Sequence, residues 1–476
     1  MLTATKALKV KEIVKLSGCS FLDIPLPLLD RGHVLEMIHD LHDRALQAPS
    51  SSVAHALSAL RLADNVPPLM SHLLELMAGH PRFLEKLLFH LGRPEGHTDC
   101  WTPATFIARM AALRAPTAGS IRLEDVLVPI SDAIASRYSA FKGYMDQPKF
   151  SAIVPQLVGY TLFEWPVTRQ LMLTEDGYQC SVRELEEDGI VFLTPVNAAL
   201  SSSSAVTSAI SSAPSSSVSS SAFPSSSSNV CADVQLRLVM PFLWLHRVYA
   251  RHSSNHAVSV VQLPLVKTLT CRLSPAQNEE LTMSVLALKC FCLVKMGQQT
   301  VTAAMLFGAS AGELPVRLPS LPATQWPVVK LRHQVTPAKW VHWSQDQAAS
   351  PIPRSGFFLN GEKAPFWDGY ALTSPPVFVQ DKQGLVSREK VAKGTAPEKT
   401  KWAEVEAEWD KCKVSDPMQP LFLFCTDAIV TGRPSPLPSG VIVVDQYTQA
   451  DFFGPLLASR KAMCLSELGA SASSAS

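Results

Sequence analysis

The chain has 476 residues, of which 47% are hydrophobic and 17% charged, and its formal net charge is +1. This length accommodates about three domains of ordinary size. The small net charge excludes the overall basic bias of a dedicated nucleic-acid-binding protein, so any contact with nucleic acid must be local. The ten cysteines include no C-x-x-C pair, which favours reduced thiols over disulfides or zinc. No apolar run reaches the length of a membrane span and no secretory signal is visible, so we expect an intracellular protein, in the nucleus or cytoplasm.

Residues 1–100 are predicted to be mostly helical. Apolar residues recur at spacings of three and four in "HVLEMIHDLHDRAL" and in "PPLMSHLLELMAGHPRFLEKLLFHLG". Gly79 followed by Pro81 predicts that one helix ends and another begins there.

Residues 101–250 are predicted to form a winged-helix-like domain. In "SVRELEEDG", Ser181 and Glu184 match a capping box and Gly189 supplies the stop. "IVFLTP" and "VQLRLVMP" then predict two strands, and the Ser-rich residues 199–230 between them predict a disordered insertion at the wing tip. Because the helix is acidic, a module that only joins its neighbours is the alternative to one that contacts DNA.

Residues 251–465 are predicted to form an α/β domain, followed by a disordered tail over 466–476. An amphipathic helix is expected from a cap at Ser274 to a stop at Gly297. After it come a hairpin over 367–383, a charged helix, two apolar strands and a final helix. Strands separated by helical patterns are typical of an α/β domain.

Three polar residues in the hairpin form the candidate site. Strand alternation places Gln380 and Lys382 on one face and Asp381 on the other. A three-residue loop over 374–376 would place Asp368 opposite Lys382, with Gln380 diagonal to it.

This cluster suits metal-assisted phosphodiester hydrolysis. Asp368 and Gln380 supply oxygen ligands for Mg²⁺, and Lys382 is expected at the scissile phosphate. Glu280, near the start of the preceding helix, is the candidate upstream carboxylate, with Glu279 nearly as suitable. A structural Asp–Lys ion pair on a half-exposed sheet is the alternative explanation of the hairpin.

The order of these segments resembles the PD-(D/E)xK restriction-endonuclease-like fold, in its D…QxK variant, through "PFWD" and "VFVQDKQ". The segments "GHPRFLE" and "FFGPLLASR" resemble those of Crinkler and retrotransposon hot spot (RHS) type proteins. In that group an AAA+/STAND nucleoside-triphosphatase module precedes a winged-helix-like region and a nuclease-like domain. The resemblance implies that residues 1–100 correspond to the end of the triphosphatase module, with Pro81 and Arg82 near nucleotide.

The chain departs from that family because it contains no G-x-x-x-x-G-K-[ST] motif, so neither a nucleotide cofactor nor ATP hydrolysis is expected. The expected fold is therefore multidomain α+β, with a helical region, a winged-helix-like domain and a restriction-endonuclease-like domain. The expected function is metal-dependent nucleic-acid cleavage, on DNA in preference to RNA and without membrane association. A catalytically silent member that binds nucleic acid or protein, with an effector-like or chromatin-associated role, is the alternative.

Overall fold

A computed structural model describes residues 81–93, 142–196, 235–247, 275–335, 356–382, 399–412 and 420–458, with short gaps inside these ranges, and the single positions 36, 105, 130 and 132. The two predicted disordered segments, 199–230 and 466–476, lie outside the described residues, as does most of the helical region predicted over 1–100. Within that region the structure describes one helix, α5 (Pro81–Gly92), which begins at the predicted proline. The described residues combine helices and sheets, as expected for an α+β protein.

A six-stranded sheet organises the C-terminal part of the chain, in the order β15-β13-β11-β10-β9-β8. Strands β11, β13 and β15 run parallel, whereas β9, β10 and β11 form an antiparallel meander. The strands are β8 (Val329–Lys330), β9 (Phe357–Leu359), β10 (Gly369–Ala371), β11 (Val377–Lys382), β13 (Leu421–Thr426) and β15 (Val441–Val444). The predicted strands at 421–426 and 440–445 are confirmed, while the three-residue strand β9 is too short to give a sequence signal.

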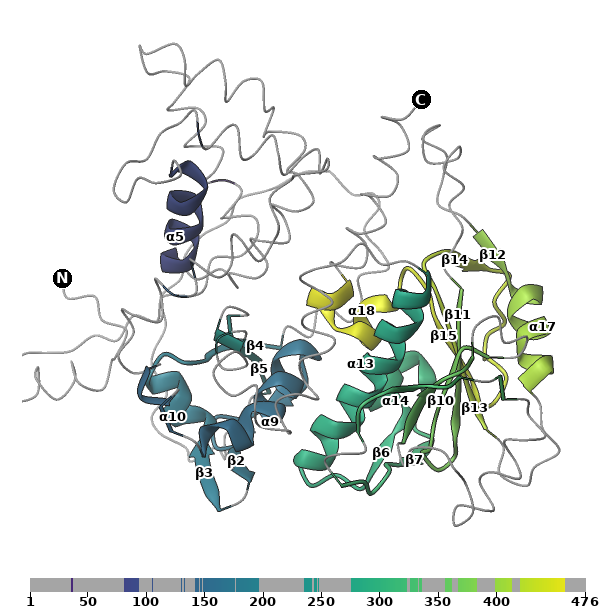
Figure 1. The fold of residues 1–476 in the computed structure, drawn as a ribbon, viewed down its shortest axis with the longest axis horizontal. Helices are drawn as coiled ribbons and strands as arrows, with labels where there is room; N and C mark the ends of the chain where they lie inside the picture. Colours follow the sequence, from purple (N-terminus) through teal and green to yellow (C-terminus); the bar gives the residue numbers. More distant parts are fainter. Residues whose placement is uncertain are drawn as a thin grey trace, which may run out of the picture.

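Both faces of this sheet are covered by helices, α13 (Pro275–Lys295) on one side and α17 (Trp402–Cys412) on the other (Figure 1). Strand alternation divides the core accordingly. Val377 and Val379 of β11 belong to the apolar cluster on the α13 side, whereas Phe378 packs with Trp402 on the α17 side. Each strand of the parallel half therefore contributes to two separate cores.

Helix α13 was predicted to be amphipathic, with one apolar stripe, but the structure buries it on all sides. Every residue from 281 to 293 is buried. The side away from the sheet is covered by α9 (Phe150–Leu162), which packs directly on α13 (Figure 1). A Cβ placed on Gly159 of α9 would lie 2.9 Å from the Cβ of Cys292, so the two helices approach through this glycine. Gln156 adds a polar link, donating its Nε2 to the carbonyl of Lys295 at 2.9 Å.

A buried lysine connects α13 to two short helices, α14 (Ala303–Phe307) and α18 (Gln449–Phe453). Lys289 Nζ donates to the carbonyl oxygens of Leu306 at 2.9 Å and Asp451 at 3.1 Å. It also lies 4.9 Å and 5.1 Å from the ring centroids of Phe163 and Phe452. Burial lowers the pKa of Lys289 to about 7. This ammonium joins elements from three distant parts of the chain.

Smaller elements complete the described fold. Strands β1 (Pro166–Val167), β5 (Leu236–Val239) and β4 (Phe192–Pro195) form a sheet in that order, so the two predicted strands that flank the Ser-rich segment pair with each other. Strands β2 (Met172–Glu175) and β3 (Tyr178–Ser181) form a hairpin that leads into α10 (Val182–Glu187). The remaining elements are β6 (Thr300–Thr302), η2 (Ala309–Ala311), β7 (Pro315–Arg317), β12 (Lys399–Lys401) and β14 (Ile429–Thr431).

The hairpin between β10 and β11 has a different register from the predicted one. Ala371 pairs with Val377, so residues 372–376 form a five-residue loop instead of the predicted three-residue loop. The loop is longer because Ser374 pairs with Arg317 of β7 instead of closing the hairpin. Continuation of this register places Asp368 opposite Gln380 and not opposite Lys382. A shift of two residues preserves the face on which each side chain lies.

None of the described helices combines the length and apolar character that crossing a bilayer requires.

The contact between α9 and α13 can be tested at Gly159. We expect Gly159→Ala to lower the free energy of unfolding by about 1–3 kcal/mol, because the new methyl group overpacks the helix contact. Chemical denaturation of the full chain measures this loss. Gly143→Ala is the matched control, because no atom lies within 4 Å of a Cβ at that position. Equal stability of the two variants would contradict the close approach.

Candidate functional site

Asp368 lies immediately before β10 and its backbone is held on both sides. Its N–H donates to the carbonyl of Val379 at 2.9 Å, and its carbonyl accepts from the N–H of Asn360 at 2.7 Å. The preceding Trp367 is fully buried and stacks on Phe378 with ring centroids 4.4 Å apart. The carboxylate therefore leaves the backbone from a rigid position.

Gln380 and the backbone of Asp381 bind one oxygen of this carboxylate. Gln380 Nε2 donates to Asp368 Oδ2 at 2.6 Å, and the N–H of Asp381 donates to the same oxygen at 2.7 Å. Strand alternation predicted Asp368 and Gln380 on one face in diagonal positions, and the two side chains lie in direct contact.

Asp381 belongs to this site as well, although its side chain points to the other face as strand alternation predicted. Its carboxylate accepts hydrogen bonds from Asn278 Nδ2 at 2.6 Å and from Thr282 Oγ1, both on α13. Helix α13 can come close to the sheet here because Gly369 has no side chain. A Cβ at that position would lie 2.6 Å from Met283 Sδ. Asp381 thus connects α13 to the residues that hold Asp368: its side chain lies on the other face, as predicted, while its backbone N–H contacts Asp368.

Lys382 points to α17, where it pairs with a glutamate. Its Nζ lies 3.2 Å from Glu408 Oε1, and Lys411 Nζ lies 3.0 Å from the other oxygen of the same carboxylate. The side chain of Lys382 is 49% exposed, whereas that of Glu408 is 14% exposed. The predicted lysine is therefore open to solvent at the end of β11, with Glu408 as its ion-pair partner.

Burial and neighbouring carboxylates perturb the acids of this site. Burial raises the pKa of Asp368 to about 7, and the charges of Glu279 and Asp381 act in the same direction. The hydrogen bond from the Asp381 N–H and the charge of Lys382 oppose this rise. Burial, followed by repulsion from Asp381, also raises the pKa of Glu279, while Lys330 and Lys382 act to lower it.

Glu279 is therefore an α13 carboxylate whose charge acts on Asp368. Glu280 was the first candidate for this role from the sequence, with Glu279 nearly as suitable. Both residues are partly buried. Because a helix turns by about 100° per residue, the side chains of Glu279 and Glu280 point in different directions. The predicted role of Glu280 remains untested.

The residues of this site suit a hard cation that keeps most of its water. Within the described ranges, no three His, Cys, Asp or Glu side chains gather closely enough to hold a metal by themselves. Mg²⁺ does not need such a cage, because it is held by one or two carboxylates while it keeps several waters. Burial and, to a smaller extent, the charges of Glu279 and Asp381 raise the pKa of Asp368, and a cation beside this carboxyl would offset both effects. Asp368 and the amide oxygen of Gln380 are therefore the groups of the predicted set that could hold magnesium here.

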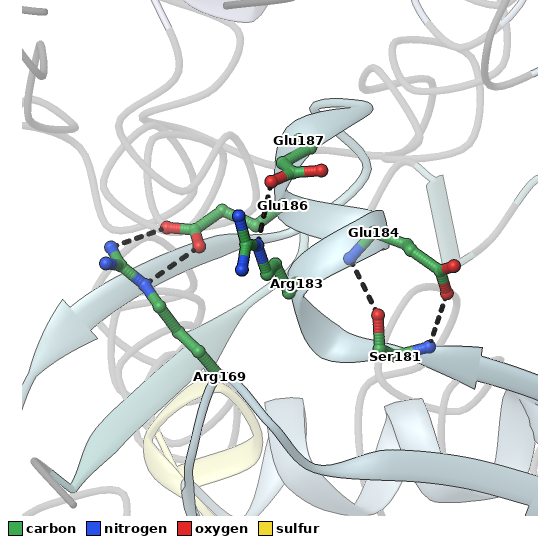
Figure 2. Close-up of polar contacts among 6 residues, drawn as sticks. All are labelled: Arg169, Ser181, Arg183, Glu184, Glu186 and Glu187. Carbon is green, nitrogen blue, oxygen red and sulfur yellow. Dashed lines mark hydrogen bonds and ion pairs between the residues drawn. The ribbon is translucent and has the colours of Figure 1, made fainter. Parts of the chain in front are cut away.

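Two arginines lie at helix α10, Arg183 on the helix itself and Arg169 before β2, and both are paired with acids of α10 (Figure 2). Arg169 contacts Glu186 with its Nε 3.0 Å from Oε2, and Arg183 contacts Glu187 at 2.9 Å. Ser181 and Glu184 form the predicted capping box. This acidic surface is unfavourable for phosphate.

Three contributors to the site were absent from the sequence prediction: Asn278, Thr282 and Glu408. Asn278 and Thr282 lie four residues apart, so both face Asp381, and this spacing is the signal that could have indicated them. Glu408 is one of three glutamates within the eleven residues of α17, and nothing local distinguishes it. The side chains of Pro81 and Arg82, predicted near nucleotide, lie outside the described residues.

Comparison of the chain with protein-family models, curated proteins and solved structures gives no match.

The raised pKa of Asp368 predicts how stability depends on pH. The folded state binds a proton more tightly than the unfolded state, so this carboxyl stabilises the fold at low pH. That contribution is complete below the ordinary pKa of 3.8 and is lost as the pH rises through the folded-state pKa of about 7. Asp368→Asn should remove this part of the pH dependence of the unfolding free energy. Denaturant titrations at several pH values, with Asp410→Asn as an exposed control, measure it. A parallel pH dependence in wild type and Asp368→Asn would contradict the raised pKa.

Proposed function

We propose that the site around Asp368 is a metal-dependent phosphodiesterase centre and that the protein is a nuclease-like member of the Crinkler and RHS type. The observation that carries this proposal is the contact between Asp368 and Gln380, with Lys382 two residues further on the same face of β11. These are an acid, an amide and an ammonium at the C-terminal end of β11, a central strand of the sheet. Such a set supplies both a cation ligand and a phosphate contact.

Each residue has a distinct role in the proposal. Asp368 and Gln380 would hold Mg²⁺, with the Gln380 amide turned so that its oxygen faces the ion. When bound, the ion lowers the pKa of water and neutralises charge on a phosphate. Lys382 leaves its ion pair with Glu408 and binds the scissile phosphate, which reaches it from the solvent side. Glu279 and Asp381 keep the centre anionic.

The order of elements supports the family assignment. Helix α13 is followed by the antiparallel strands β9, β10 and β11, then by α17 and the parallel strand β13. This agrees with the segment order on which the resemblance to the PD-(D/E)xK fold rests. The β1-β5-β4 sheet with α10 before its hairpin supports a winged-helix-like middle domain. On this basis DNA is the proposed partner, with an effector-like or chromatin-associated role.

A catalytically silent binding protein is the second candidate, and two observations favour it. Gln380 presents its Nε2 to Asp368, and a donor cannot ligate a cation. Lys382 is paired with Glu408. Both arrangements would have to change before a metal and a phosphate could bind.

Cleavage by the full chain tests the proposal. A fragment beginning at 271 lacks α9, which covers α13, so the intact protein is required. We expect cleavage of DNA with Mg²⁺ or Mn²⁺, and a loss of at least about a hundredfold in Asp368→Asn and Lys382→Ala, because each removes a group that stabilises charge on the phosphate.

Lys142→Ala, an exposed change in the middle of the chain, is the control. Equal cleavage by Asp368→Asn and wild type would assign the activity to another site. Salt-dependent DNA binding without cleavage would support the silent alternative.

The ion pair between Lys382 and Glu408 gives a separate prediction. If phosphate exchanges with Glu408, then Glu408→Gln should tighten DNA binding by up to about fivefold, because an exposed ion pair no longer competes. Fluorescence anisotropy with labelled DNA measures this affinity. Glu406→Gln, on the exposed side of the same helix, makes the same charge change away from Lys382. An equal effect of the two substitutions would show that only net charge matters.

A further inference from the structure

The buried amide of Asn278 has an oxygen without a hydrogen-bond partner. Asn278 lies near the start of α13 and is 1% exposed. Its Nδ2 donates to Asp381 Oδ1, which fixes the plane of the amide, while its Oδ1 has no hydrogen-bond partner within the described structure. A buried acceptor left unsatisfied costs about 1–3 kcal/mol. A group that occupies this position only when a ligand is bound would explain such an oxygen.

The surroundings of this oxygen are anionic. Asp381, the direct partner of Asn278, is 6% exposed. Glu279 is the next residue on α13, and the Asp381 N–H contacts Asp368 at 2.7 Å. An amide oxygen next to the Asp381 carboxylate, whose charge also acts on Glu279 and Asp368, is a suitable environment for a hard divalent cation and an unfavourable one for an anion.

We propose that Asn278 Oδ1 is a ligand for the divalent cation of this site, supplied by α13 where this helix packs against the end of β11. The inference rests on the proposed metal centre and adds a residue that the D…QxK pattern does not contain. Helix α13 contributes a neutral oxygen here, where an acid was expected from the sequence. The cation is thereby held between α13 and the β10–β11 hairpin and links the two.

Thr282 provides a matched control on the same helix. It donates the second hydrogen bond to the Asp381 carboxylate but has no orphaned oxygen at the site. Thr282→Val and Asn278→Ala therefore each remove one donor from Asp381. Only Asn278→Ala also removes the proposed ligand.

Cation binding is measured without reference to activity, by titrating the full chain with Mn²⁺ and following free Mn²⁺ by electron paramagnetic resonance. We expect Asn278→Ala to weaken Mn²⁺ binding at least about tenfold, the smallest loss typical of changes around a metal site. Thr282→Val should bind Mn²⁺ within about threefold of wild type. Asn278→Asp should retain or strengthen binding, because a carboxylate oxygen replaces the amide oxygen.

Thermal unfolding keeps the test decisive if Asn278→Ala folds poorly. Without metal, Asn278→Asp should unfold at a lower temperature than wild type, because the substitution adds a fourth carboxylate to the site, directly next to Asp381. Excess Mn²⁺ should raise its unfolding temperature more than that of wild type. A lower unfolding temperature that Mn²⁺ does not restore would overturn the proposal.

The outcomes separate this inference from the proposed function. Mn²⁺ binding that depends on Asn278, in a protein that leaves DNA intact, supports the ligand and rejects the nuclease. Cleavage that depends on Asp368, with wild-type Mn²⁺ affinity in Asn278→Ala, rejects the ligand and leaves the nuclease in place. Absence of Mn²⁺ binding to wild type rejects both.

Discussion

The enclosure of α13 is the constraint on which the rest of this structure depends. The helix is covered by the sheet on one side and by α9 on the other, and Gly159 and Gly369 let both neighbours approach closely. A helix held in this way cannot rotate or slide without opening the core. Its first turns therefore present Asn278, Glu279 and Thr282 to the end of β11 in a fixed geometry. The middle of the chain is thus a structural part of the C-terminal site and not a separate attachment.

Electrostatic repulsion is the second property of the site. Glu279 comes from α13, and Asp368 and Asp381 come from the β10–β11 hairpin; the core forces helix and hairpin together, and burial weakens the solvation of these charges. The site tolerates this through neutral donors, namely Gln380, Asn278 and Thr282, and through lysines at its rim. A cation would compensate the charges more directly than these donors do. The raised pKa of Asp368 and the unsatisfied Asn278 oxygen are two consequences of the same arrangement.

Much of the fold followed from local sequence, because helix caps and apolar strands have strong local signals. The capping box at Ser181, a helix from Ser274 to a stop at Gly297 and strands at 421–426 and 440–445 were all predicted, and the structure has them within two residues of these bounds. The hairpin register was not, because Ser374 pairs with Arg317, a residue 57 positions away. Alternation placed Gln380 with Asp368 and Asp381 on the opposite face, but it gave no information on the partners of Asp381, which lie on α13. Contacts between distant elements thus decide the site, and no spacing within one segment reveals them.

The central claim is that the carboxylates and amides at the end of β11 hold a divalent cation. Anomalous diffraction from crystals of the full chain soaked in Mn²⁺ tests it most directly. The account predicts an anomalous peak within coordination distance of both an Asp368 oxygen and Asn278 Oδ1, with the Gln380 amide oxygen turned toward the metal. A well-ordered site without a peak, or a peak bound only by other residues, would contradict the account.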